Sequence, residues 1–311
     1  MPRFLSILAN PTSAKAVEHA DSLESALASE GWTVNRTGRS PGESAEVVAE
    51  RVEGSEVLVL AGGDGTVRFF SDVAIATDIP IWQHAAGNEN LFARSLGMEA
   101  TCASLLNAIE QRRIHFIDRF QAGTESGLLI VSSGIDAEIV ARVSRDRNGA
   151  VSNLDYILPT IRSLPSWKAA RYTIEIDGVR KVDSRTGWVF VANSPDYGGR
   201  FDPVPNAVMD DDLIDTCFVP MKGALGAMEW MMHARLRSAR LRGSLMRSRR
   251  FEHYAGSQIR ITSEEAVRWQ IDGDAYQDGL PCHEMEIVVQ PGLIPVLMPA
   301  TNGRVGRAIT Q

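Results

Sequence analysis

The chain has 311 residues, of which 44% are hydrophobic and 23% charged, and its formal net charge is −7. These values are typical of a globular protein with a sizeable core, and the length predicts two domains. The negative charge argues against a general nucleic-acid binder, and no apolar run reaches the ~18 residues of a transmembrane segment. The three widely spaced cysteines argue against a disulfide framework or a zinc site and indicate a cytoplasmic protein.

The first third of the chain alternates between short apolar runs and segments with helical spacing. The predicted strands are residues 4–9, 32–35, 57–60 and 79–82, and the predicted helices include residues 17–27, 44–52 and a segment from 66 onward. This alternation predicts a parallel sheet covered by helices on both faces. Ligands of such sheets bind at the carboxyl ends of the strands, where Asn10, Thr37, Gly62 to Thr66 and Gly87 fall.

The most informative turn is Gly62-Gly63-Asp64-Gly65-Thr66, which follows an apolar run and precedes a helix. Glycines let the backbone approach an anion, a helix N-terminus favours negative charge, and Thr66 adds a hydroxyl. Asp64 would repel a phosphate unless a cation lay between them, which indicates a nucleotide with Mg²⁺. An ordinary tight turn is the alternative, because the two common glycine-rich nucleotide motifs are absent from this turn.

A second turn, Gly87-Asn88-Glu89-Asn90, again places a glycine and polar side chains ahead of a helix. It is either a second contact for the nucleotide or an ordinary helix cap, since asparagine caps helices well.

From about residue 114 the pattern changes to short strands joined by Gly, Pro and Asp turns. The predicted strands are residues 115–122, 128–132, 172–177, 188–193, 213–219, 258–262, 267–272, 284–290 and 294–298. With helices near 136–147, 152–163 and 222–241, this half is predicted to be an antiparallel β sandwich or a barrel-like domain. We expect catalysis in a cleft between the two domains.

Two acidic segments of the second half could carry chemistry. Asp210-Asp211-Asp212 precedes a strand and is either a solvated turn or a cation site. Asp272-Gly273-Asp274 ends a strand and is either a hairpin turn, as Asp177-Gly178 is expected to be, or a catalytic pair.

Residues 235–250 contain seven arginines and no acidic residue. With the methionines and tryptophan of residues 221–241 they predict either a basic amphipathic helix on an anionic membrane or a solvated arginine face over a packed core.

Six motifs occur in order along the chain. They are Asn10-Pro11-x-Ser13, Gly62-Gly63-Asp64-Gly65-Thr66, Gly87-x-x-Asn90-x-Phe92-Ala93-Arg94, Ser133-Gly134-Ile135-Asp136, Pro205-x-Ala207 with the acids that follow, and Asp272-Gly273-Asp274. Together they resemble the diacylglycerol kinase catalytic-domain family, which includes bacterial diacylglycerol kinases and the sphingosine and ceramide kinases. The resemblance spans residues 3–299.

The resemblance implies an α/β domain like that of NAD kinases and phosphofructokinases at residues 1–113 and a β-rich lipid-substrate domain at residues 114–299. Residues 300–311 would be a tail that could pack back on the first domain. It also implies ATP as the phosphate donor, Mg²⁺, and a lipid acceptor met at the membrane surface. An edge strand in either domain could pair two chains into a homodimer.

Carried over by position, the resemblance assigns roles to single residues. The phosphates of ATP would lie on Gly62, Gly63, Asp64, Gly65, Thr66 and Arg68, while Asn10, Thr37, Gly87, Asn88 and Asn90 would help to hold the nucleotide. Asp64 would hold Mg²⁺, and Asp272 or Asp274 would accept the proton of the lipid hydroxyl. Asp211 with the carbonyls of Val208 and Leu213 would bind a second, structural Mg²⁺.

The sequence departs from the family pattern at five positions. Asn88 stands where threonine is usual, Leu91 where aspartate is usual, Ala14 and Asp212 where glycine is usual, and Asp274 where glutamate is usual.

From the residues and the resemblance, the first hypothesis is an ATP- and Mg²⁺-dependent kinase of a diacylglycerol, ceramide or sphingoid base. The alternatives are a kinase of a soluble acceptor and a non-catalytic nucleotide or lipid sensor.

Overall fold

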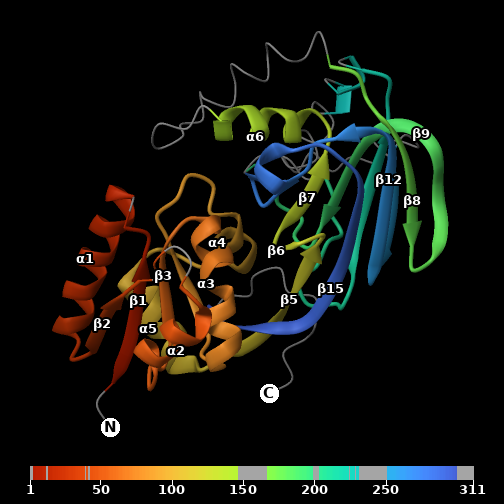
Figure 1. Ribbon diagram of the computed structural model, residues 1–311. Coiled ribbons are helices and arrows are strands. Elements are labelled where there is room, and N and C mark those ends of the chain that lie inside the picture. The colour runs from red at the N-terminus through yellow and green to blue at the C-terminus, as the bar shows by residue number, and fades with distance from the viewer. Residues whose placement is uncertain are drawn as a thin grey trace. The chain divides into compact units, whose positions relative to one another are not determined.

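The computed structural model describes residues 3–11, 13–38, 40, 43–145, 167–198, 203–223, 225–227, 229–230 and 251–299. The chain forms two compact units (Figure 1). Unit 1 comprises Met1–Asp118 and Pro291–Gln311, and unit 2 comprises Arg119–Gln290. The chain passes from unit 1 to unit 2 within strand β5 (Ile114–Ala122) and returns within strand β15 (Cys282–Leu297).

Unit 1 is built on a parallel sheet, as the alternation of strands and helices predicts. Its strands lie in the order β2 (Thr33–Thr37), β1 (Phe4–Ala9), β3 (Leu58–Gly62) and β4 (Ile81–Ala85). Val296 of β15 extends this sheet by pairing in parallel with Ile81. Every residue of the central strand β3 is buried, because helices cover both faces of the sheet.

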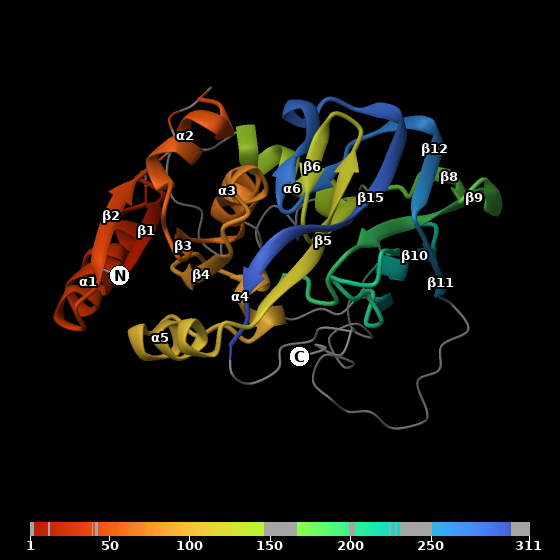
Figure 2. The same ribbon diagram turned by 90° about the horizontal axis from the view of Figure 1, so that it is seen from below.

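The helices of unit 1 form two layers around this sheet (Figure 2). Helix α1 (Ala14–Ser29) packs on β1 to β3 and meets α5 (Cys102–Gln111), whereas α2 (Ala45–Val52) and α3 (Asp64–Thr77) pack together on the other face. A short helix, α4 (Leu91–Leu96), follows β4. The hydroxyl of Ser13 caps α1 by accepting a hydrogen bond from the N–H of Ala16.

Unit 2 is a β sandwich in which the long strand β9 (Val179–Ala192) belongs to both sheets. The first part of β9 pairs with β8 (Arg171–Ile176), which pairs with β12 (Gln258–Val267) and then β15. The last part of β9 pairs with β7 (Ile130–Ser133) and β10 (Ile214–Pro220). Three short strands extend this second sheet, and they are β11 (Glu252–Gly256), β13 (Gln270–Ile271) and β14 (Asp274–Ala275).

The core of unit 2 lies between its two sheets, where Tyr172, Phe218, Ile259 and Trp269 are almost fully buried. A second apolar cluster covers the other face of β7, β9 and β10, and helix α6 (Ile135–Arg145) contributes to it through Ile135 and Ile139. A 3-10 turn, η3 (Tyr276–Gly279), follows β14, and β6 (Glu125–Gly127) pairs with β5. None of the helices in the described ranges has the length and hydropathy that a bilayer span requires.

The structure corrects several predicted element boundaries. β9 has 14 residues where only residues 188–193 are predicted, because its first half is largely exposed and is held by pairing with β8 rather than by apolar content. β11 is not predicted at all, and β15 is one continuous strand where two are predicted. Helix α3 begins at Asp64 rather than Thr66. The predicted helix at 152–163, most of the one at 222–241 and the tail lie outside the described residues.

The predicted hairpin at Asp177-Gly178 is confirmed, and its aspartate has a second function in the fold. Ile176 pairs with Val179, and both turn residues have positive φ. The Asp177 carboxylate accepts hydrogen bonds from the N–H groups of Ser257 (3.0 Å) and Gln258 (2.9 Å). The hydrogen bond from Gln258 is the largest cause that lowers the pKa of Asp177. Asp177 thus ties the β8–β9 turn to the start of β12.

We expect Asp177→Asn, which suits the same turn, to lower the free energy of unfolding at pH 7 by about 1 kcal/mol at this solvent-screened position. Because the folded-state pKa lies below the unfolded value of about 4, this contribution is present above that pH and is lost as the pH falls through the folded-state pKa. Urea unfolding at pH 7 and about pH 3 measures it. Asp183→Asn, at an exposed carboxylate paired with Arg180, is the control. A stability difference that does not change with pH would contradict the assignment.

Candidate functional site

The structure brings the predicted nucleotide residues of unit 1 together at one edge of the parallel sheet. Thr37 ends β2 opposite Leu8, Asn10 follows β1, and Gly62 ends β3 opposite Ala85 of β4. All of these positions are carboxyl ends of neighbouring parallel strands. This edge is where ligands of open α/β sheets bind.

The first glycine turn leads directly from β3 into α3 without a loop. A Cβ atom on Gly62 would lie 2.2 Å from the Thr66 hydroxyl oxygen, so the buried Thr66 side chain packs against this glycine. A Cβ atom on Gly65, in contrast, would meet nothing within 4 Å, and Gly65 is exposed. Because α3 begins at Asp64, the N–H groups of Asp64 and Gly65 lie in the first helical turn, where an α-helix supplies no acceptor. This turn is open to an anion at Gly65.

The second glycine turn packs backbone to backbone against the first. A Cβ atom on Gly87 would lie 2.5 Å from the Cα atom of Gly63, which only glycine avoids. Asn90, with φ of 51°, closes this turn because its side-chain oxygen accepts from the Gly87 N–H and its amide donates to the Gly87 carbonyl, both at 2.9 Å. The Asn90 side chain therefore shapes the turn, whereas Asn88 is exposed on it.

Asp64 joins the two turns. Its carboxylate accepts hydrogen bonds from the N–H groups of Leu91 (3.0 Å) and Phe92 (2.9 Å) at the start of α4. Burial raises the pKa of Asp64, and these hydrogen bonds oppose the rise. The carboxylate that the sequence predicts as a magnesium ligand is thus also the acceptor for the N-terminus of the second helix.

Sequence reasoning missed Gln83, a buried amide beneath both turns. Its Nε2 donates to the Gly62 carbonyl (3.2 Å), and its Oε1 accepts from the Ala93 N–H (2.7 Å). The signal was a polar residue in the otherwise apolar run Ile81-Trp82-Gln83. A glutamine at such a position must find hydrogen-bond partners, and it does so in the two segments that form the site.

In unit 2 the Asp272-Gly273 pair forms a two-residue hairpin turn between β13 and β14, with positive φ at both residues. The Asp272 carboxylate accepts from three consecutive backbone N–H groups, those of Leu128 (2.7 Å), Leu129 (2.8 Å) and Ile130 (2.9 Å). Both of its oxygens are therefore engaged. Asp274 is the first residue of β14 and is half-buried.

Two carboxylates at the start of β10 have raised pKa values, chiefly because they are partly buried. Burial, followed by the charge of Asp211, raises the pKa of Asp215 to about 6, and burial also raises the pKa of Asp211. The Asp211 carboxylate accepts from the Leu213 N–H at 3.2 Å. Across the described ranges no group of three His, Cys, Asp or Glu side chains has the arrangement of a metal site. The predicted set uses one carboxylate and the carbonyls of Val208 and Leu213, and it stays a prediction.

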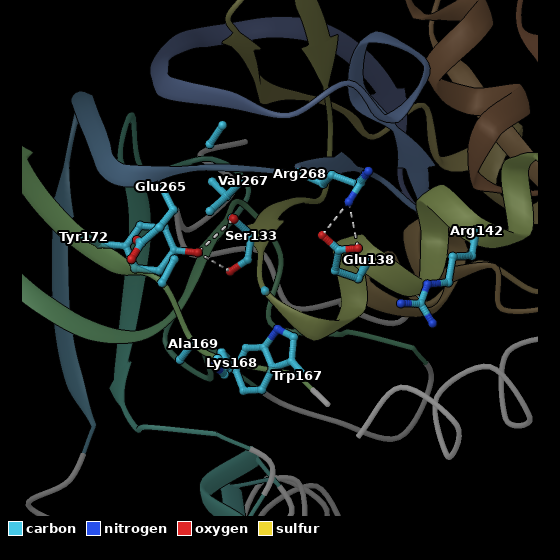
Figure 3. A pocket seen from close by; sticks show the side chains of 13 residues that line it. Ser133, Glu138, Arg142, Trp167, Lys168, Ala169, Tyr172, Glu265, Val267 and Arg268 are labelled. Atoms are coloured by element: carbon cyan, nitrogen blue, oxygen red, sulfur yellow. Dashed lines mark hydrogen bonds and ion pairs between the residues drawn. The ribbon is translucent and has the colours of Figure 1, made fainter. Parts of the chain in front are cut away.

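A cavity of about 380 Å³ lies in unit 2 beside α6 and the ends of β8 and β12 (Figure 3). The hydroxyls of Ser133 and Tyr172 are 2.9 Å apart on its wall. Glu138 and Arg268 form a bidentate ion pair along another side, with both oxygens 2.9 Å from Arg268 Nη1. In each pair the two side chains hydrogen-bond to one another, and these bonds order the wall of the cavity.

Two family models match the chain. Residues 5–122 match the diacylglycerol kinase catalytic domain, and residues 129–298 match the YegS C-terminal NAD kinase beta sandwich-like domain. The second match alone covers more than half of the chain.

Relatives are similar over nearly the full length. A Pseudomonas fluorescens protein named "Probable lipid kinase YegS-like" is 22% identical over 283 residues, which are 89% of this chain and 90% of that protein. A Pseudomonas syringae protein of the same name is 22% identical over 293 residues, covering 89% and 88%. The crystal structure of a diacylglycerol kinase from Bacillus anthracis matches with a TM-score of 0.66 at 17% identity, covering 96% of this chain and 97% of that chain, which shows a shared fold.

One assignment follows from the α/β unit with its paired glycine turns, the β sandwich and the two family matches. The chain belongs to the diacylglycerol kinase catalytic-domain family.

Proposed function

We propose that the protein is a lipid kinase that transfers the γ-phosphate of ATP to a hydroxyl of a membrane lipid, such as a diacylglycerol, a ceramide or a sphingoid base. The observation that carries the proposal is the pair of interlocked glycine turns at the carboxyl edge of the unit 1 sheet, open at Gly65. Membership of the family and relatives named as lipid kinases support the lipid acceptor.

In this proposal the first turn of α3 binds the phosphates of ATP through Gly62 to Thr66, with Arg68 one helical turn further on. Asn10, Thr37 and the 87–90 turn hold the rest of the nucleotide at the same sheet edge. Asp64, which accepts from two N–H groups of α4, is also the proposed ligand of a magnesium ion. Mg²⁺ would neutralise phosphate charge during transfer. Asp211 with the carbonyls of Val208 and Leu213 is proposed to hold a structural Mg²⁺.

We assign the general base to Asp274 rather than Asp272. Three backbone N–H groups engage both oxygens of the Asp272 carboxylate, so we assign Asp272 the role of an anchor. Asp274 follows directly on the anchored turn, which places its carboxylate on a β strand rather than on a loop. It would accept the proton of the lipid hydroxyl as the phosphate transfers.

A lipid acceptor lies in a bilayer, so the kinase must meet it at the membrane surface. The segment at residues 221–250, with its arginines at 235–250, is the proposed contact, and most of it lies outside the described residues. Pairing of two chains into a homodimer is also part of the proposal.

The direct test is to incubate the protein with γ-labelled ATP, Mg²⁺ and an extracted lipid mixture and to identify products by mass spectrometry. We expect one new phospholipid, and its mass names the acceptor. Label found on a soluble acceptor such as NAD, with no labelled lipid, would contradict the lipid acceptor, and no labelled product despite bound ATP would contradict the kinase.

Gly65→Ala tests the phosphate site without disturbing the fold. The new methyl group meets no protein atom, and alanine favours a helix by about 1 kcal/mol over glycine, so the melting temperature should not fall. The methyl group would occupy the approach to the helix N-terminus, and we expect KM for ATP to rise about tenfold or more, since a charge-assisted hydrogen bond contributes roughly 1.5–3 kcal/mol.

Two glycines serve as controls for this experiment. Gly223→Ala in unit 2 adds a methyl group in ordinary contact and should change neither quantity. Gly87→Ala would collide with Gly63 and should lower the melting temperature. An unchanged KM for ATP in Gly65→Ala would argue against the phosphate site.

Asp274→Asn and Asp272→Asn separate the base from the anchor. For Asp274→Asn we expect kcat to fall about 10²–10⁴-fold with the melting temperature retained. For Asp272→Asn, which tolerates the same backbone conformation, we expect the free energy of unfolding to fall by about 1–3 kcal/mol, because an amide cannot accept all three N–H groups. Steady-state kinetics and urea unfolding measure the two effects. Full activity in Asp274→Asn would refute its role as the base.

A further inference from the structure

Helix α6 begins with a buried carboxylate that the proposed chemistry does not use. Asp136 accepts hydrogen bonds from the hydroxyl of Ser132, from Trp188 Nε1 (2.9 Å) and from the hydroxyl of Tyr197 (2.8 Å). Burial raises the pKa of Asp136, and the hydrogen bonds from Ser132, Tyr197 and Trp188 oppose that rise. A buried carboxylate with three donors is a fixed point in the structure.

This fixed point is connected to the hairpin that carries Asp272 and Asp274. Gln270 Nε2 donates to the Ser132 hydroxyl at 2.6 Å, and Gln270 Oε1 accepts from the Gly273 N–H at 2.8 Å. Ser132 and Gln270 lie opposite each other on β7 and β13, and both are fully buried. An unbroken chain of hydrogen bonds therefore runs from Asp136 through Ser132 and Gln270 to the turn.

A second connection holds the other end of the same segment. Glu138, two residues after Asp136 on α6, pairs with Arg268 through both carboxylate oxygens (Figure 3). Arg268 Nε donates to the Gly279 carbonyl at 2.9 Å. Arg268 and the turn at residues 272–273 are thus connected to α6, and Arg268 in turn holds Gly279 at the end of η3.

The hairpin is short, so contacts outside it define its position, and the connections to α6 add to the pairing of β13 with β7 and the anchoring of Asp272. Each of its strands has two residues, and only Gln270 with Ala275 and Ile271 with Asp274 pair across it. An isolated two-stranded hairpin is marginally stable even when it is longer. A displacement of about 1 Å in a reacting group can cost about 10²-fold in rate.

We propose that Asp136 and Glu138 of α6 are positioning residues for the carboxylate of Asp274. Asp136 holds the hairpin through Ser132 and Gln270. Glu138 holds it through Arg268. The inference rests on the proposed role of Asp274 in the lipid kinase reaction. It assigns the Ser133-Gly134-Ile135-Asp136 motif a task, which is to start α6 where its two carboxylates reach the hairpin.

The test is Ser132→Ala, which breaks the chain between Asp136 and Gln270 and leaves every proposed substrate contact in place. The matched control is Ser263→Ala, because Ser263 is also a buried serine of unit 2, with its hydroxyl on the carbonyl of Glu265. Hydrogen exchange of the Gly273 amide is measured by mass spectrometry without substrate. We expect exchange to rise about tenfold in Ser132→Ala and not in the control, as a weakened hydrogen bond predicts.

Kinetics of ATP-dependent phosphorylation provide the second readout. In Ser132→Ala we expect kcat to fall about tenfold while KM for ATP stays within about twofold, because a displaced base slows the chemical step and leaves nucleotide binding intact. Unchanged exchange at Gly273, or raised exchange with an unchanged kcat, would overturn the proposal.

Arg268→Lys provides an independent variant if Ser132→Ala does not fold. Lysine keeps the charge beside Glu138 but lacks the planar fork that also reaches the Gly279 carbonyl. The position is half-buried, and we again expect a lower kcat with an unchanged KM for ATP. An unchanged kcat would overturn the role of the Glu138–Arg268 ion pair.

If the wild-type protein phosphorylates no lipid, the proposed function fails. The exchange measurement alone still decides whether α6 holds the turn.

Discussion

The structure depends on aspartate carboxylates that accept hydrogen bonds from main-chain N–H groups. Backbone donors outside helices and sheets must find acceptors when they are buried. Asp64 accepts from N–H groups at the start of α4, Asp272 from those of Leu128 to Ile130 at the start of β7, and Asp177 from those at the start of β12. Asp118, which is fully buried, accepts from the Gly292 N–H at 2.7 Å where β15 bends within unit 1. The starts of α4, β7 and β12 are therefore held by hydrogen bonds to carboxylates as well as by packing.

This constraint changes how acidic motifs are assigned to chemistry. An aspartate in a glycine turn suggests a metal ligand or a base, but a carboxylate has two oxygens, and its neighbours decide how they are used. Both oxygens of Asp272 accept from backbone donors, which is why the proposed base is Asp274. Asp64 accepts from two backbone amides and connects the two turns of the proposed phosphate site. In the Asp272-Gly273-Asp274 motif, the first aspartate anchors the turn and the second is the proposed base.

Buried glutamine side chains also connect separate segments through hydrogen bonds. Gln83 connects the end of β3 with α4 in unit 1, and Gln270 connects Ser132 with Gly273 in unit 2. Each has one donor and one acceptor group used by different segments, so each holds two segments at a defined separation. Both lie on strands directly beside a proposed catalytic turn. A rigid second layer of this kind is what a site with precise geometry requires.

The amino-acid sequence by itself determined the parallel α/β unit, the change to a β-rich second half and the glycine turns, because these follow from local periodicity and from the conformations that glycine permits. It also placed Asn10, Thr37, Gly62 and Gly87 at one sheet edge, which the register confirms. Only the tertiary structure decided that β9 serves two sheets, that Gly87 must touch Gly63, and that Asp272 is occupied by residues 128–130. These depend on contacts between residues far apart in the chain, and no local pattern encodes which partner a carboxylate or an amide will meet.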